Sequence, residues 1–314
     1  MFYFVFPWAD GGDLQELWVR EGHKPVTLDR LLWSLRQMLG LTDAVRALHQ
    51  AGIRHSSIKP QNILNFTDLK DSEPNGYGIL VLAGFCISRH HHVATDLRRI
   101  ATNTSSATVR YEAPEARSEE EYNKPRPRRY DMWSLGCMFL DYTVWLLYGA
   151  DAVDVFRRRR ISTRDPGDRL RESGNFFTQR SRGIKIHSKV SKAIELIRSD
   201  PRCPEGTALR DLLDVIEDHL LQLDPEHRAA APELYDKIER IVVAALDDRD
   251  GGYLRGPFSC SYPTPKFFVR STRPRASMSS TLLQHASADH SDSSTRVIWG
   301  ASSSESIPSD GGAA

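Results

Sequence analysis

The chain has 314 residues, of which 40% are hydrophobic, enough to bury a sizeable core in one large domain or two ordinary ones. Its 42 Lys and Arg residues balance 41 Asp and Glu residues, so the formal net charge is +1. This balance excludes a strong overall field that would draw the chain to nucleic acid or to a membrane surface, and we expect neither as a partner.

Four cysteines are spread along the chain without a C-x-x-C pair, which favours free thiols over a disulfide framework or a zinc site. The first residues lack the charged region and apolar core of a secretory signal, and no stretch reaches the roughly 18 apolar residues of a membrane span. We therefore expect an intracellular protein, cytoplasmic or nuclear. The cysteines are Cys86, Cys137, Cys203 and Cys260.

The first half of the chain predicts a strand and then a long helix. Residues 1–6 are aromatic and β-branched, which predicts a short strand ended by Pro7. Residues 28–49 carry apolar side chains close to the i, i+3, i+4, i+7 spacing of an amphipathic helix, and Thr27 is placed as its N-cap.

The following segments alternate between apolar and strongly polar. Residues 63–64 and 78–83 predict two short strands joined by a polar turn. The apolar run at residues 138–147 predicts a buried helix. The four arginines at positions 157–160 have two interpretations, contact with phosphate or an acidic partner and a solvated linker, and the solvated linker is the default expectation.

Five motifs between residues 1 and 245 stand in a characteristic order. They are FPWADGGDL at 6–14, HSSIKPQN at 55–62, TVRYEAPE at 108–115, DMWSLG at 131–136 and LDPEHR at 223–228. With these motifs the chain resembles the large C-terminal lobe of eukaryotic protein kinases. The resemblance implies an α+β, mainly helical fold with a hinge strand and a short β-hairpin, over a domain at residues 1–248 from which the small lobe is missing.

The same resemblance implies that the chemistry of this lobe is degenerate. Ser57 stands at the position of the kinase base Asp, and a neutral hydroxyl is a poor substitute for a carboxylate that takes a proton. Gly84 stands at the position of the metal-binding Asp of D-F-G, so we expect no metal there. Lys59 and Asn62 remain, either for residual phosphate binding or as scaffolding of the loop, and we favour scaffolding.

Three residues match the kinase adenine site. In that family the backbone at the position of Ala9 bonds the adenine ring, Phe6 guards the pocket behind it, and Leu64 forms its floor. An edge strand that binds no ligand is the other interpretation of residues 6–9, and the sequence leaves both open.

Four further residues match positions that hold the kinase large lobe together. In the family Glu115 pairs with the Arg at position 228, and Asp131 accepts hydrogen bonds from the backbone of the catalytic loop. His55 belongs to the frame of that loop. We expect all four residues to have structural roles.

Residues 249–314 are expected to form a disordered tail. Within it, residues 271–314 carry 13 Ser together with repeated Pro and Gly and few large apolar side chains. Such a segment cannot bury enough apolar surface to fold. The wording of residues 6–12 and 145–149 is also similar to kinase-like proteins of filamentous fungi.

The preferred hypothesis is an inactive, pseudokinase-like domain that serves as a binding or scaffold module for a protein partner, without a cofactor. The alternative is a Ser/Thr protein kinase that uses ATP and Mg²⁺, whose small lobe is encoded upstream of the first residue. A gene remnant that never accumulates is a third reading. Substrate, partner and oligomeric state have no signature in the sequence.

Overall fold

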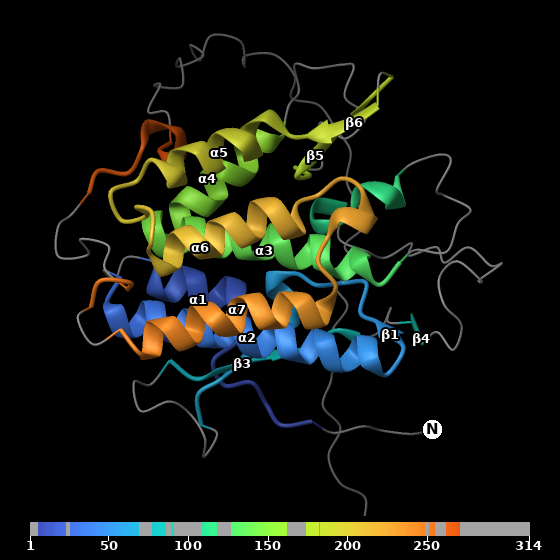
Figure 1. The fold of residues 1–314 in the computed structure, drawn as a ribbon, viewed down its shortest axis with the longest axis horizontal. Helices are drawn as coiled ribbons and strands as arrows, with labels where there is room; N and C mark the ends of the chain where they lie inside the picture. Colours follow the sequence, from blue (N-terminus) through green and yellow to red (C-terminus); the bar gives the residue numbers. More distant parts are fainter. Residues whose placement is uncertain are drawn as a thin grey trace, which may run out of the picture. The chain divides into compact units, whose positions relative to one another are not determined.

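A computed structural model shows how the chain folds (Figure 1). It describes residues 6–22, 26–68, 77–85, 89–90, 109–117, 127–161, 174–181, 183–248, 251–254 and 262–270. The chain divides into one compact unit, Met1–Arg270, and a second, Ser271–Ala314, which lies wholly outside the described residues. Residues 1–5 of the strand predicted at residues 1–6 lie outside them as well, as does the predicted turn between the two short strands.

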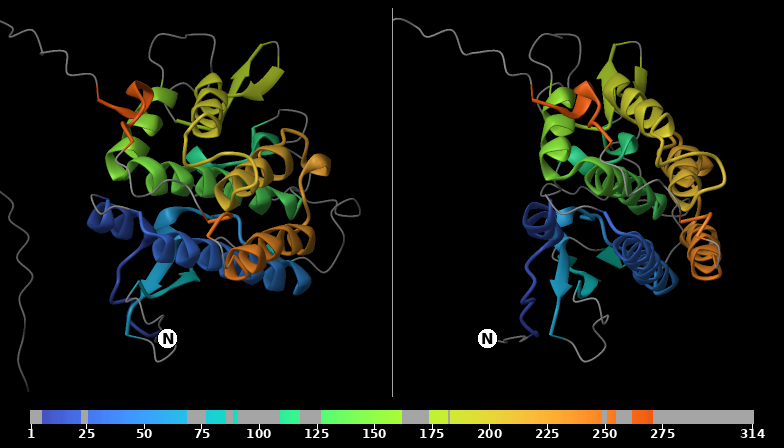
Figure 2. Two further views of the ribbon diagram at one scale, coloured as in Figure 1. Left: turned by 60° about the vertical axis from the view of Figure 1, so that its left-hand side comes forward. Right: turned by 90° about the vertical axis from the view of Figure 1, so that its left-hand side faces the viewer.

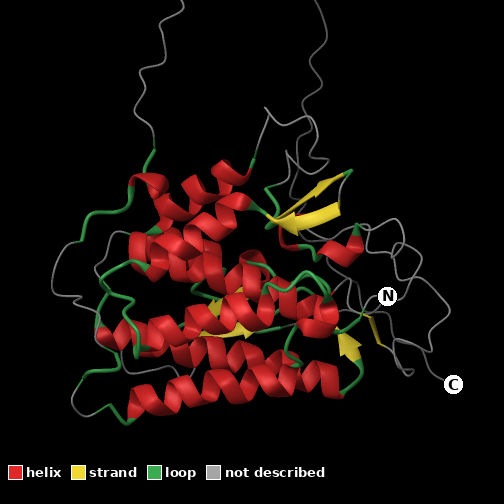
Figure 3. Ribbon diagram, turned by 45° about the horizontal axis from the view of Figure 1, so that its top comes forward, coloured by secondary structure: helices red, strands yellow, loops and turns green. Residues whose placement is uncertain are grey.

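The described part of the compact unit is mainly helical, with strands confined to short pairs (Figure 3). The α-helices are α1 (Leu14–Glu21), α2 (Leu28–Gln50), α3 (Arg129–Tyr148), α4 (Ala150–Arg160), α5 (Ser188–Arg198), α6 (Ala208–Val215) and α7 (Ala231–Leu246). A π-helical turn, η6 (Ile216–Leu220), continues α6, and short 3₁₀ turns include η1 (Pro60–Asn62), η4 (Val109–Tyr111), η5 (Pro114–Ala116), η7 (Pro225–His227) and η8 (Lys266–Phe268).

Helix α3 is the centre of the core. Every residue from Tyr130 to Leu147 is buried, as expected for a helix that is apolar around its whole circumference. The buried helix predicted for residues 138–147 is confirmed. Within the part of the chain that the structure describes, no helix combines the length and the hydropathy needed to cross a membrane.

Helix α2 confirms the predicted amphipathic helix and its start. The Thr27 hydroxyl accepts a hydrogen bond from the Arg30 amide at 3.2 Å, which satisfies one of the free donors of the first turn. Helices α2 and α7 run side by side through much of their length (Figures 1 and 2). This pair forms one face of the unit, and the end of α2 leads directly into the loop at residues 55–62.

Within the described residues the strands form three antiparallel pairs: β1 (Ile53–Arg54) with β4 (Arg89–His90), β2 (Ile63–Phe66) with β3 (Ile79–Leu82), and β5 (Phe177–Arg180) with β6 (Gly183–Ile186). The β2–β3 pair confirms the two predicted short strands, with Ile63 opposite Leu82. The β5–β6 hairpin had no signal that we recognised. Strand β2 starts directly after the 55–62 loop and so fixes its second end.

The expected hinge strand is absent from its described part, because residues 6–9 have no strand geometry. The linker is instead fixed just after them. The Gly11 amide donates to the Asn65 carbonyl at 3.0 Å, and the Asn65 amide donates to the Gly12 carbonyl at 2.8 Å. Asp13 then caps α1 with a capping box, in which the Asp13 carboxylate accepts from the Glu16 amide and the Glu16 carboxylate accepts from the Asp13 amide.

The compact unit extends beyond residue 248, where we expected the tail to begin. Residues 262–270, which we call the C-terminal strap, return to α3 and α4. The Phe268 ring is 2% exposed and stacks on Tyr148 with centroids 4.7 Å apart. The Arg159 guanidinium donates to carbonyls of the strap, among them that of Lys266 at 3.2 Å. Aromatic side chains that precede the Ser-rich stretch give the strap enough apolar surface to bury.

Candidate functional site

The loop at residues 55–62 is anchored on α3. The amide of His55 donates to Asp131 Oδ2 and the amide of Ser56 donates to Asp131 Oδ1, both at 2.8 Å. Ser56 has φ = 71°, the left-handed region, which a non-glycine residue adopts only when its surroundings enforce it. Here the two bonds to a single carboxylate supply that enforcement.

Asp131 is completely buried and is satisfied as an anion. His49 Nε2, on α2, lies 2.9 Å from Asp131 Oδ2, which adds a third partner to the two loop amides. Burial alone would raise the pKa of this carboxyl, but the hydrogen bonds from His49 and from the loop backbone outweigh it and hold the pKa below its ordinary value. The ionised carboxylate therefore ties together α2, α3 and the loop.

His55 is fixed as a neutral ring. Its Nδ1 accepts a hydrogen bond from the Ser57 amide at 3.2 Å, so Nε2 carries the proton and donates to the Ala83 carbonyl at 2.9 Å. Burial lowers the pKa of His55, which favours the same neutral form. Its ring also meets the Phe85 ring edge-on, with centroids 4.9 Å apart. His55 thus joins the loop to the residues on either side of Gly84.

Ser57, Asn62 and Gly84 come together at one point. Asn62 Nδ2 donates to the Ser57 carbonyl at 2.7 Å and lies 3.0 Å from Ser57 Oγ. A Cβ atom built on Gly84 would lie 2.4–2.7 Å from the amide group of Asn62, far inside van der Waals contact. The side chain of Asn62 therefore fills the space into which a carboxylate at position 84 would extend.

These residues do not fit a magnesium ion held as kinases hold it. Magnesium needs hard oxygen ligands in octahedral array. Gly84 offers no side chain, and Asn62 offers a single amide oxygen, since its Nδ2 donates to the Ser57 carbonyl. Among the described residues, no group of three or more His, Cys, Asp or Glu side chains is arranged to hold a metal ion.

Lys59 contributes to the loop through its backbone. Its φ and ψ are extended, at −163° and 159°, and its carbonyl accepts the Asn62 amide at 2.9 Å, which starts the turn η1. The backbone and side chain of Asn62 are thus both held within the loop.

The three residues expected at the adenine site all lie within the part of the chain that the structure describes. Phe6 is 79% exposed. The Ala9 carbonyl accepts the Gly12 amide at 3.1 Å within a turn, and half-buried Leu64 sits in β2 opposite Val81.

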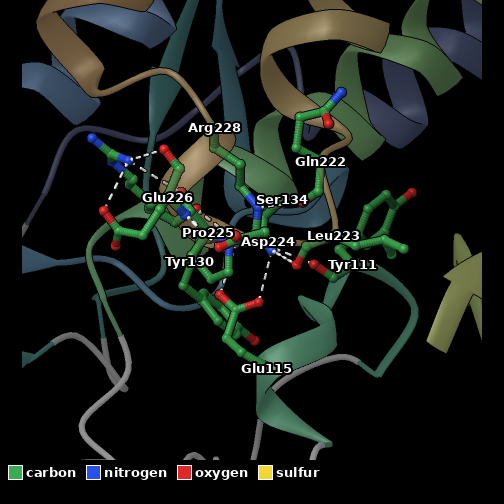
Figure 4. A network of polar contacts seen from close by, with 11 residues as sticks. Tyr111, Glu115, Tyr130, Ser134, Gln222, Leu223, Asp224, Pro225, Glu226 and Arg228 are labelled. Atoms are coloured by element: carbon green, nitrogen blue, oxygen red, sulfur yellow. Dashed lines mark hydrogen bonds and ion pairs between the residues drawn. The ribbon is translucent and has the colours of Figure 1, made fainter. Parts of the chain in front are cut away.

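Glu115 and Arg228 form a buried bidentate ion pair (Figure 4). Arg228 Nη1 and Nη2 each lie 2.8 Å from one carboxylate oxygen of Glu115, and the side chains are 0% and 5% exposed. The guanidinium also donates to the carbonyls of Gln222, Leu223 and Arg129, at 2.7, 3.1 and 3.1 Å. The pair joins η5 to the start of α3 and to the segment before η7.

A second buried ionic cluster, formed by Arg160 and Asp141, was not predicted from the sequence. The expected solvated linker at 157–160 is wrong, because these arginines end helix α4 and Arg160 is fully buried. Its Nη2 lies 3.6 Å from Asp141 Oδ1 on α3, and the Tyr111 hydroxyl donates to Asp141 Oδ2 at 2.9 Å. The only signal was an aspartate inside the apolar run at 138–147, which demands a partner.

Comparison with known proteins agrees with this geometry. The sequence matches the model of the protein kinase domain family over residues 1–237. It is 32% identical over 135 residues to a calcium/calmodulin-dependent protein kinase of Metarhizium anisopliae, covering 43% of this chain and 30% of that protein. It is 29% identical over 223 residues to the dual specificity protein kinase Ttk of Danio rerio, covering 70% and 18%.

A third relative is the human serine/threonine-protein kinase 16, which is 26% identical over 220 residues, covering 69% of this chain. The match covers 57% of that relative, and less of the other two.

Proposed function

The chain belongs to the protein kinase family, and from this premise we propose that its kinase domain is catalytically inactive and acts as a binding or scaffold module for a protein partner. The proposed module works without ATP or magnesium. We place it inside the cell, where widely spaced cysteines remain reduced.

One observation carries the proposal: the Asn62 amide occupies the space beside Gly84 and bonds to Ser57. Phosphoryl transfer depends on positioning and on neutralising the charge of the transferred group. Loss of a positioned general base alone lowers a rate by about 10²–10⁴-fold. With Ser57 and Gly84 in the two carboxylate positions, both the base and the main metal ligand are gone.

The contacts that support the fold favour a retained scaffold. The Glu115–Arg228 pair and the Asp131 carboxylate are each satisfied by several buried hydrogen bonds. Buried charges of this kind destabilise a fold strongly when one partner is lost. A chain that keeps them while lacking the reactive carboxylates is suited to binding and not to transfer.

The test is a thermal-shift titration of the purified chain with ATP, with and without Mg²⁺ or Mn²⁺, beside an active protein kinase as control. We expect no nucleotide-dependent change in Tm and no phosphate transfer to a basic acceptor protein. Transfer from ATP that is abolished by Lys59→Ala or Asn62→Ala would overturn the proposal and establish a Ser/Thr protein kinase.

A further inference from the structure

Two buried charges lie beneath a cleft between α1, α3 and α4. The Arg160 guanidinium is sandwiched between the rings of Phe156 and Phe176, at 3.9 and 4.1 Å from their centroids. Its Nε donates to the Gly174 carbonyl at 3.0 Å, but its nearest approach to Asp141 is a 3.6 Å contact, too long for a hydrogen bond. The guanidinium is therefore held firmly while its two terminal nitrogens stay unbonded.

The cluster has more unused donors than acceptors. Arg160 Nη1, Arg160 Nη2 and Arg110 Nε are buried atoms without a hydrogen-bond partner, and Asp141 Oδ1 is the one such acceptor among them. Buried polar atoms are normally bonded, by protein groups, water or a ligand. The imbalance favours an incoming group that accepts hydrogen bonds.

The cleft above this cluster has a volume of about 340 Å³. The residues that line it include Arg110, Tyr111, Asp141, Trp18, Asp154 and Arg157. Asp154 is already engaged by three arginines: Arg157 at 2.6 Å, Arg270 at 3.3 Å, and Arg158. Its charge is therefore more than neutralised before any ligand arrives.

The charges around the cleft leave a positive surplus. The lining residues and their ion-pair partners include five arginines, at positions 110, 157, 158, 160 and 270, against aspartates at positions 141, 151 and 154, which leaves two positive charges unbalanced. Burial raises the pKa of Asp141, which weakens the negative side further. The buried Arg160 and Asp141 balance each other, and the surplus is carried by arginines that reach solvent, so the net positive charge around the cleft attracts an anion.

We propose that this cleft binds an oxyanion against Arg110, with the buried Arg160 supplying further positive charge. The oxyanion is the carboxylate or phosphate group of an acidic segment in a partner protein. This chemistry gives the proposed binding module its class of partner and to that extent rests on the proposed function. The anion site itself requires neither a partner nor the absence of catalysis.

The experiment titrates the full chain with inorganic phosphate, and in parallel with acetate, at constant ionic strength, while Tm and the heat of binding are followed. We expect saturable binding, and the stronger of the two probes identifies the preferred oxyanion. Arg110→Gln should weaken binding about tenfold or more, since it removes a charged hydrogen-bond donor. Asp141→Asn should tighten binding, because it removes a negative charge and keeps an acceptor for Tyr111.

The matched control is Arg240→Gln, on α7, which contributes no residue to this cleft and should leave binding unchanged. Absence of saturable binding in the wild-type chain would overturn the proposal and leave water as the occupant. Equal binding by Arg110→Gln would place the anion elsewhere and overturn it too. So would tighter binding of methylammonium than of phosphate, weakened by Asp141→Asn, because it would make the cleft a cation site.

Failure here is distinguishable from failure of the proposed function. Phosphate binding is measured without ATP, whereas the inactive module is tested by phosphate transfer. A chain that transfers phosphate and still binds phosphate at Arg110 would refute the first proposal alone.

Discussion

Replacing Glu115 with alanine should destabilise the domain strongly, because it leaves the Arg228 guanidinium buried without its anion. Both oxygens of Glu115 bond Arg228 at 2.8 Å, and the arginine side chain is 0% exposed. Loss of one partner from a buried pair destabilises by about 3–5 kcal/mol. Three backbone carbonyls still accept from Arg228, so we expect the lower end, about 3 kcal/mol.

The assay is urea unfolding of the full chain, followed by circular dichroism, with Tm as a second measure. A loss of about 3 kcal/mol corresponds to roughly 6–12 °C in Tm for a domain of this size. Glu226→Ala is the matched control, since Glu226 meets Arg129 at 3.4 Å while 78% exposed, and exposed pairs contribute about 0–1 kcal/mol. If Glu115→Ala destabilised no more than Glu226→Ala, the buried pair would not hold the lobe together as reasoned here.

Three further predictions concern the loop and the strap. Gly84→Asp should lower the free energy of unfolding in urea by about 1–3 kcal/mol, because a side chain at φ = 85° strains the backbone and displaces Asn62. It should not create Mg²⁺-dependent ATP binding in a thermal-shift assay. Acidification should lower the stability of the fold in two pH ranges, one set by His55 and one by Asp131. Because His55 has a lowered pKa, the unfolded chain takes up its proton first, so stability falls below about pH 6.5, and His55→Asn should flatten that part of the profile. Because Asp131 also has a lowered pKa, its contribution is present above about pH 4 and is lost as pH falls through its folded pKa; an unchanged profile in Asp131→Asn would contradict this. Phe268→Ala should lose about 3–5 kcal/mol and a chain ending at residue 248 should lose at least as much, whereas equal stability of both with the wild type would show that the strap is dispensable.

The sequence was sufficient where a local pattern determines the structure. The spacing of apolar residues and the hydroxyl of Thr27 specify α2 together with its first turn. The predominantly apolar character of residues 138–147 specifies a buried helix, because apolar side chains occur on every face of it. The family match then follows from motifs in order, without any knowledge of contacts.

The sequence was insufficient where one residue depends on another that is distant in the chain. A run of four arginines has the composition of a solvated segment, and only the aromatic rings of Phe156 and Phe176 around Arg160 make one of them a core residue. The space beside Gly84 is filled by Asn62, and nothing in either local sequence announces that contact. In the same way, composition predicted the end of the domain at residue 248, before the strap. The contact that brings the strap into the compact unit, Phe268 against Tyr148 of α3, joins residues far apart in the chain.

The C-terminal strap also bears on how the domain is made. Arg159 meets the carbonyls of Lys266 and Phe267, residues that follow it by more than 100 positions. Contacts so distant in sequence form slowly, and during synthesis they cannot form until both partners have left the ribosome. The contacts that the strap makes with Tyr148 and Phe156 therefore form only when the last part of the domain arrives. For that interval part of the aromatic surface of Tyr148 lacks its partner, and transiently exposed surface of this kind favours aggregation.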